Sequence, residues 1–371
     1  MRMGDFYPER LSWIRRKRGI NKTTLGEKIG VDLRSISAYE NGEYPPTQPN
    51  IERLARALRV SEAFFFMGSL SGPDPSQVSF RSFSKLTSAK RDMALGSATL
   101  AFLLCDWVSA KFELPPLQIP DLREIKNPEE AAFALRYQWG LGERPVSNMI
   151  HLLESKGVRV FSLALDVADV DACCTWHNDE PFVFLNTKKS NARRRFDAAH
   201  ELGHLVLHRH GEYEGRITEI EADEFASAFL MPRDGFRSTA PRLVDLKNII
   251  PNKSTWGVSV GAYIVRLHRL KMISDWHYRT LYKQISQRGY RRKEPFDHRP
   301  EMSKLAEMIL SALRDEGIST RGISDQLGID VSDINDLLFD IAIIGVSGER
   351  SGDVLKRDTD HLKLAVDNTR K

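Results

Sequence analysis

The chain has 371 residues, which exceeds one typical domain and indicates two or three. Hydrophobic residues make up 41% of the chain and charged residues 28%, a balance typical of a soluble globular protein. No apolar run approaches the ~20 residues of a membrane span, and the charged N-terminal segment contains no apolar signal core. Three cysteines, two of them adjacent, exclude a disulfide framework, so we expect a cytoplasmic protein without membrane contact.

Positive charge is concentrated near the N-terminus. Residues 1–60 contain 12 Lys or Arg against 7 Asp or Glu, a balance of +5. The remainder contains 42 basic against 43 acidic residues, a balance of −1. The uneven distribution favours contact between the first segment and nucleic-acid phosphates.

Two short helices are predicted in this basic segment, over 24–30 and 33–41, with a turn at Gly30. Asp32 is placed to cap the second helix. In a helix-turn-helix the second helix enters the major groove and its early residues reach base edges. The predicted DNA contacts are Lys22 for a phosphate and Leu33, Arg34, Ser35 and Ser37 on the second helix.

The spacing Leu-Gly-x-x-Ile-Gly-Val, then Ile-Ser, then Glu-Asn-Gly resembles the XRE (phage repressor-like) helix-turn-helix family over about residues 8–66. The resemblance implies binding of double-stranded DNA through residues 1–67. It also implies a homodimer, because such readers bind paired half-sites. The alternative is a helical domain that serves only protein contacts.

After a linker rich in Pro, Gly and Ser, the pattern changes from helical to mixed. Cys173 and Cys174 are expected to pack after the first strand, and a strand at 181–185 would offer an edge for an extended substrate. The expected elements are helices at 86–112 and 127–139, strands at 158–163 and 181–187, helices at 193–210 and 217–230, and further helices within 240–290.

The helix at 193–210 contains His-Glu-x-x-His within an apolar run. His200 and His204 are four residues apart, so both rings lie on one helix face and can bind one metal ion. This pattern is typical of zinc peptidases, in which Glu201 would take a proton from water activated by the metal. The alternative is a core helix with internally satisfied histidines, and His208 is expected to close the helix end.

Catalytic zinc requires a third protein ligand. His210 has the spacing of one known pattern, but the glycine that this pattern needs is absent. Glu219 and Asp223 share a face of the next helix, so one can bind zinc while the other holds a ligand histidine. This argument favours Glu219 as the ligand, with Glu221 and Glu224 as alternatives.

The combined pattern HELGHLVLH, then E-x-E-A-D-x-F-A-x-x-x-L-M-P, resembles the ImmA/IrrE family of metallo-endopeptidases over about residues 145–236. FVFLNT ahead of RRRFDAAHELGH fits the same family. The resemblance implies Zn²⁺ held by His200, His204 and Glu219, with Glu201 as catalytic base. Asp223 stands where the family commonly has Asn, and a role beside a ligand histidine is expected for it.

The family resemblance also implies a function. Its members cut XRE-type repressors and so relieve repression of stress-response or mobile-element genes. Here the substrate would be a separate repressor, or the chain itself, cut in the linker at 69–79. The competing hypothesis is a DNA-binding regulator whose metal site is structural or sensory and not proteolytic.

The C-terminal stretch 323–339 also has helix-turn-helix spacing. Its second helix carries Asp330, Asp333, Asp336 and Asp340 and no Lys or Arg, so DNA phosphates would be repelled. We expect a module for protein contact or dimerisation.

The predicted fold class is mainly α and multidomain. It combines an all-α helix-turn-helix domain, an α+β zincin-like peptidase domain with a small sheet, and a helical C-terminal region. The predicted segments are the DNA-binding domain at 1–67, the linker at 68–79, a helical connecting region at 80–140, the peptidase domain at 141–290, the C-terminal module at 300–345 and a tail at 346–371.

Overall fold

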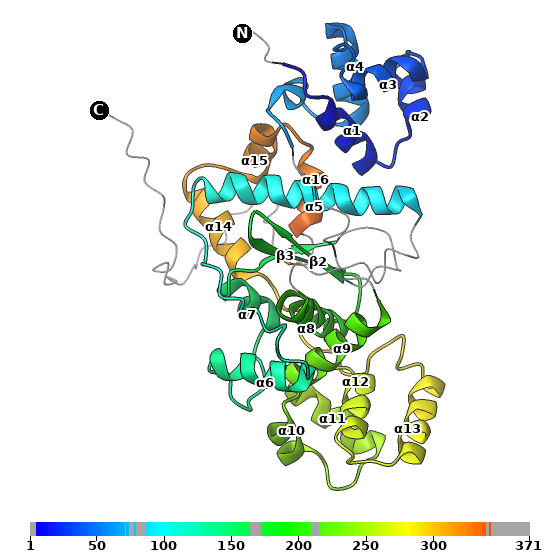
Figure 1. The fold of residues 1–371 in the computed structure, drawn as a ribbon, viewed down its shortest axis with the longest axis vertical. Coiled ribbons are helices and arrows are strands. Elements are labelled where there is room, and N and C mark those ends of the chain that lie inside the picture. The colour runs from blue at the N-terminus through cyan, green and yellow to red at the C-terminus, as the bar shows by residue number, and fades with distance from the viewer. Residues whose placement is uncertain are drawn as a thin grey trace, which may run out of the picture.

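The computed structural model describes residues 5–70, 72–73, 78, 87–163, 172–208, 215–338 and 341–342. A compact group of helices at its N-terminal end stands above the rest of the chain in Figure 1. Its elements are α1 (Pro8–Lys17), α2 (Lys22–Ile29), α3 (Leu33–Asn41), α4 (Gln48–Leu58) and the 3-10 helix η1 (Glu62–Phe66). Apolar side chains from each of these helices are buried, which gives the group a packed interior.

A long helix, α5 (Ser88–Ser109), crosses the middle of the molecule between this group and a small sheet (Figure 1). The indole nitrogen of Trp13 in α1 donates to the carbonyl oxygen of Gly96 in α5 at 3.2 Å. A Cβ atom on Gly96 would lie only 2.7 Å from the side chain of Lys17. The N-terminal helices therefore pack directly on α5.

The sheet has three strands in the order β1-β3-β2. The central strand β3 pairs in parallel with β1 and antiparallel with β2 along its length. The strands are β1 (Arg159–Ser162), β2 (Ala172–His177) and β3 (Glu180–Leu185).

The two faces of the sheet belong to two different hydrophobic cores. Successive side chains of a strand point to opposite faces. Phe182 and Phe184 of β3 join a core with α5, the N-terminal helices and the C-terminal helices. Val183 and Leu185 join the second core, built with the helices on the other face. The sheet thus connects the N-terminal helices to the region of the histidine helix.

The second core contains the histidine helix and the helices around it (Figure 1). Because both faces of the sheet are covered, its strands are almost entirely buried. The helices of this part are α6 (Pro128–Gln138), α7 (Met149–Ser155), α8 (Asn191–Leu207), α9 (Arg216–Leu230), α10 (Arg233–Thr239), α11 (Leu246–Trp256), α12 (Val260–Arg269) and α13 (Asp275–Gln287).

The C-terminal helices return to the N-terminal group and contact it directly. The backbone NH of Ser61 donates to the carbonyl oxygen of Gly328 at 2.8 Å, beside an isolated antiparallel bridge between Val60 and Ile329. Arg59 pairs with Asp330 at 3.1 Å. These helices are α14 (Lys304–Asp315), α15 (Thr320–Leu327) and α16 (Val331–Leu338).

The expected fold class is confirmed: the chain is mainly helical, with a helix-turn-helix region and one small sheet. Cys173 and Cys174 pack in the interior as expected, and they do so within a strand, β2, because alternate burial against two cores suits adjacent apolar residues. The expectation of a free edge was wrong: the strand at 181–185 has no open edge, since β3 is the centre of the sheet.

The acidic C-terminal module packs against the N-terminal part of the same chain through ion pairs. Asp340, His210 and the tail at 346–371 lie outside the described residues, as does half of the linker at 68–79. Among the described helices, none has the length and apolar character to cross a membrane.

Candidate metal centre and DNA-reading helix

The close approach of α8 and α9 sets the geometry of the candidate metal centre. Gly203, between the two histidines of the motif, faces α9. A Cβ atom at this position would lie 3.2 Å from Ala222 Cα and 3.1 Å from the ring of Phe225. Small residues on both helices let the backbones come together, and this brings the acidic start of α9 to the histidine face of α8.

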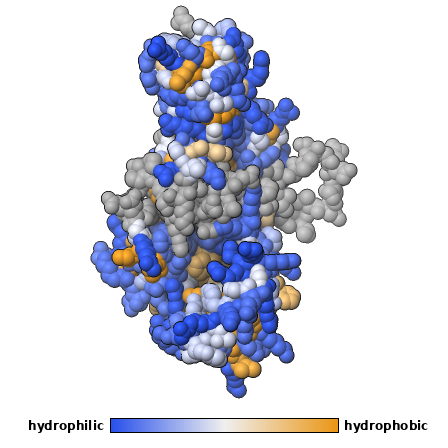
Figure 2. All heavy atoms as spheres, turned by 90° about the vertical axis from the view of Figure 1, so that its right-hand side faces the viewer, coloured by the Kyte–Doolittle hydropathy of each residue, from blue (hydrophilic) through white to orange (hydrophobic). Residues whose placement is uncertain are grey.

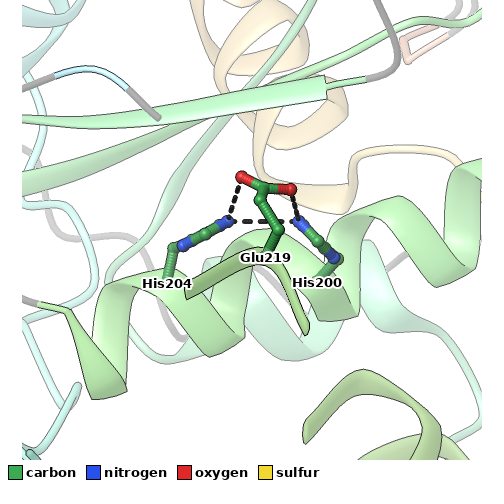
Figure 3. Close-up of side chains that lie close together, drawn as sticks. All are labelled: His200, His204 and Glu219. Atoms are coloured by element: carbon green, nitrogen blue, oxygen red, sulfur yellow. Dashed lines mark hydrogen bonds and ion pairs between the residues drawn. The ribbon is translucent and has the colours of Figure 1, made fainter. Parts of the chain in front are cut away.

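Three side chains meet there: His200, His204 and Glu219 (Figure 3). The Nε2 atoms of His200 and His204 lie 3.1 Å apart. Glu219 spans the pair, with Oε2 at 3.5 Å from His200 Nε2 and Oε1 at 3.4 Å from His204 Nε2. One donor atom from each residue lies within 4.8 Å of the others, so the three groups could hold one metal ion.

The Nδ1 atoms of His200 and His204 also have hydrogen-bond partners. Nδ1 of His200 lies 2.9 Å from Oδ1 of Asp223 in α9. Nδ1 of His204 lies 3.1 Å from Nδ1 of His208, and Nε2 of His208 lies 2.8 Å from Oε2 of Glu221. Each ring of the pair is therefore oriented with Nε2 toward Glu219.

The surroundings stabilise positive charge at the point where the ligand atoms converge. Burial opposes protonation of His200, but hydrogen bonds to Asp223 and Glu219 raise its pKa to about 10. Burial also opposes ionisation of Glu219, but hydrogen bonds to the two histidines lower its pKa to about 2. A site that favours a cationic imidazole between acids is also suited to a metal cation.

Glu201, the expected base, follows His200 on α8 and is 4% exposed. Its carboxylate acts on the strand above: burial, and then the charge of Glu201, raise the pKa of the Cys173 thiol well above its ordinary value. Cys173 is consequently a protonated, buried thiol at neutral pH, and it is not in the group of described residues that could hold a metal ion.

The other acids considered as third ligands take different positions. Glu221 contacts His208, and Glu224 lies 3.7 Å from Arg269. Among the described residues, Glu219 is the acid that joins the two histidines in a potential metal site. From the sequence, His208 was expected only to close the helix end. Its repeat of the four-residue spacing after His204 was the signal for a contact along the same face.

The second candidate site is the pair α2 and α3. Both helices begin with a side-chain cap, in which Asn21 accepts from the NH of Thr24 and Asp32 from the NH of Ser35, each at 2.7 Å. Gly30 ends α2 with a φ of 73°, which a side chain would disfavour. The expected cap at Asp32 is confirmed, and α3 spans the predicted residues.

The predicted DNA-contacting residues lie on or beside the outer face of α3. Leu33 is 50% exposed, Arg34 is exposed, and Ser35 and Ser37 are half-buried. Lys22 differs from the others because its ammonium group lies 3.3 Å from a carboxylate oxygen of Glu40. The face of the N-terminal group seen in Figure 2 is mostly hydrophilic, with small apolar areas.

Comparison with known proteins gives two family matches and one related protein. Residues 11–65 match the helix-turn-helix family model, and residues 153–268 match the model of the IrrE N-terminal-like domain. The chain is 30% identical over 63 residues to an uncharacterized HTH-type transcriptional regulator, y4wC, of Sinorhizobium fredii. That match covers 17% of this chain and 44% of the relative, less than half of its length.

The two matched segments contain the sites described above. Residues 11–65 include the capped helices α2 and α3, and residues 153–268 include all three potential metal ligands. Two segments of the chain therefore match a helix-turn-helix domain and an IrrE N-terminal-like domain, the fusion that the sequence resemblances indicated.

Proposed function

We propose that the protein is a cytoplasmic DNA-binding transcriptional regulator with zinc-dependent endopeptidase activity. The observation that carries the proposal is the convergence of His200, His204 and Glu219, in a chain that also contains a capped helix-turn-helix. Two imidazoles and one carboxylate form a donor set found in catalytic zinc sites. His200, His204 and Glu219 would hold the ion.

Bound zinc would supply Lewis acidity, which activates water and polarises a peptide carbonyl. Glu201 would accept a proton from the attacking water on its carboxylate and return it to the leaving amine nitrogen. Asp223 would keep Nδ1 of His200 protonated, so that Nε2 is directed at the metal.

The proposed substrate is a repressor-type protein, cut in trans or in the chain's own linker. The helix-turn-helix domain would bring the peptidase to double-stranded DNA, and cleavage would relieve repression in a stress or mobile-element response. Arg34 and Leu33 at the start of α3, with Ser35 and Ser37, would face the major groove, and Lys22 a phosphate. Binding to paired half-sites favours a homodimer.

The test compares Glu201→Gln with the wild type and with Glu224→Gln, a charge-matched control on α9. Each protein is assayed for zinc content, cleavage of itself and of XRE-type repressors, and expression from a reporter operator. Glu201→Gln should keep about one zinc per chain and lose both cleavage and relief of repression. The control should behave as the wild type.

If regulation persists in Glu201→Gln with bound zinc, the peptidase is not the regulatory activity. The metal site would then be structural or sensory, within a DNA-binding regulator. If the wild type binds no zinc, the metal assignment itself is wrong.

A further inference from the structure

His208, the residue at which α8 ends, contacts both a candidate ligand and an acid. Its Nδ1 lies 3.1 Å from Nδ1 of His204, and its Nε2 lies 2.8 Å from Oε2 of Glu221. His208 is 9% exposed and His204 is 1% exposed. Two buried rings and an acid of the neighbouring helix therefore form a continuous hydrogen-bonded chain.

In this hydrogen-bonded series, the position of the proton on His204 determines the position of the proton on His208. A neutral imidazole has one donor and one acceptor nitrogen. If Nε2 of His204 uses its lone pair toward a metal, its proton is on Nδ1 and is donated to Nδ1 of His208. His208 must then hold its own proton on Nε2, where it is donated to Glu221.

The other candidate ligand, His200, contacts an acid of α9 without an intervening histidine. His200 meets Asp223 of α9 directly, at 2.9 Å. His204 is one turn further along α8, and His208 bridges it to Glu221 of the same helix α9. The Nδ1 side of each ring is thus connected to an acid of α9, directly for His200 and through His208 for His204. Glu219 of α9 contacts both Nε2 atoms.

We propose that His208 and Glu221 are positioning residues that fix the tautomer and orientation of His204, as Asp223 does for His200. The inference rests on the proposed metal site and extends it to two residues that are not ligands. Outer partners of this kind raise the basicity of a ligand histidine and reduce the freedom of its ring. A protein that lacks His208 or Glu221 would bind zinc less tightly.

Direct ligation by His208 does not fit the same contacts. Its Nδ1 faces Nδ1 of His204, on the side of that ring opposite to the Nε2 pair. Its other nitrogen faces Glu221. Neither nitrogen is directed at the point where His200, His204 and Glu219 converge.

The experiment measures zinc affinity of the full chain after removal of metal, by competition with a chromophoric chelator. His208→Ala removes the acceptor for His204, whereas His208→Asn puts an amide oxygen close to the position of Nδ1. Glu221→Ala removes the terminal acid at a half-exposed position, and Glu224→Ala is the matched control on α9. The visible spectrum of the cobalt-substituted proteins reports the ligand geometry independently of cleavage.

His208→Ala should weaken zinc binding about 10- to 100-fold and alter the cobalt spectrum. His208→Asn should restore most of the affinity, Glu221→Ala should weaken binding, and Glu224→Ala should not. Circular dichroism shows whether His208→Ala folds. If it does not fold, the proposal is tested by the zinc affinities of His208→Asn and Glu221→Ala, each compared with that of Glu224→Ala.

Wild-type affinity in His208→Ala, or in Glu221→Ala, would overturn the proposal while leaving the metal site intact. An Asn variant as weak as the Ala variant would assign His208 to packing alone, which also overturns it. Absence of zinc binding by the wild type would instead reject the proposed metal site, and the positioning role with it.

Discussion

Asp333 of α16 accepts two hydrogen bonds from Arg18, the residue that follows α1, at 2.5 Å to Oδ1 and 2.7 Å to Oδ2. Lys17 donates to the same carboxylate at 2.5 Å. The Asp333 side chain is 2% exposed, so one buried acid neutralises two basic residues of the helix-turn-helix domain. Part of the positive charge that the sequence analysis assigned to DNA therefore holds the C-terminal module in place.

Replacement of this acid should destabilise the whole chain. Asp333→Ala leaves Lys17 and Arg18 without their buried partner, which typically costs about 3–5 kcal/mol. Urea denaturation should show this loss, whereas Asp325→Ala, at an exposed position of α15, should be close to wild type. A loss below about 1 kcal/mol, as for surface ion pairs, would mean that the contact does not hold the domains together.

Glu154 predicts a dependence of stability on pH. The carboxylate lies between α7 and the C-terminal module, where it accepts hydrogen bonds from the Ser303 hydroxyl and from the NH of Leu305. Burial outweighs these bonds and raises the pKa of Glu154 from 4.5 to about 7. Because the folded state holds this proton more tightly, the stabilising contribution is complete below pH 4.5 and is lost as the pH rises through 7.

Glu154→Gln, which resembles the protonated acid, should match the wild type near pH 5. By pH 8 it should be more stable by about 3 kcal/mol, the value of the pKa shift. Urea denaturation from pH 5 to pH 8 measures the difference, with Glu124→Gln at an exposed position as control. A difference that does not change with pH would contradict the raised pKa.

Glu219 should be required for metal binding. Glu219→Ala removes the carboxylate that spans both Nε2 atoms, while Glu224→Ala removes an acid of α9 that faces Arg269. Elemental mass spectrometry should find about one zinc per chain in the wild type and in Glu224→Ala, and little in Glu219→Ala. Zinc retained by Glu219→Ala would assign the third ligand to a residue outside the described part of the chain, such as His210, or to Glu221.

Arg34 should determine DNA specificity. Its exposed position near the start of α3 suits contact with a guanine, worth about 1–3 kcal/mol. The binding site is first selected from random duplexes with the wild type. Arg34→Ala should bind the selected site more weakly than the wild type. On random DNA, its loss of affinity should be no larger than that of Arg56→Ala, a control at an exposed position of α4. Equal losses on both DNAs would indicate a phosphate contact only.

Local patterns predicted much of this structure from the sequence. The cap at Asp32 and the turn at Gly30 act within a few residues, so the helix-turn-helix was found almost to its boundaries. The strand β2 was missed because its side chains are buried on both faces and the alternation of apolar and polar residues is absent. Its burial depends on two cores that form only in the folded chain.

The sequence by itself determined the two histidines at one helix face, because a spacing of four is fixed by the helix repeat. It also placed Glu219 and Asp223 on one face of the following helix for the same reason. Only the tertiary structure decided that Glu219 meets both rings, and that Glu221 reaches His204 through His208. Those contacts depend on how closely α9 approaches α8 at Gly203, a distance set by packing between helices. The union of the acidic C-terminal module with the basic first helix joins residues more than 300 positions apart in the chain, which no local pattern encodes.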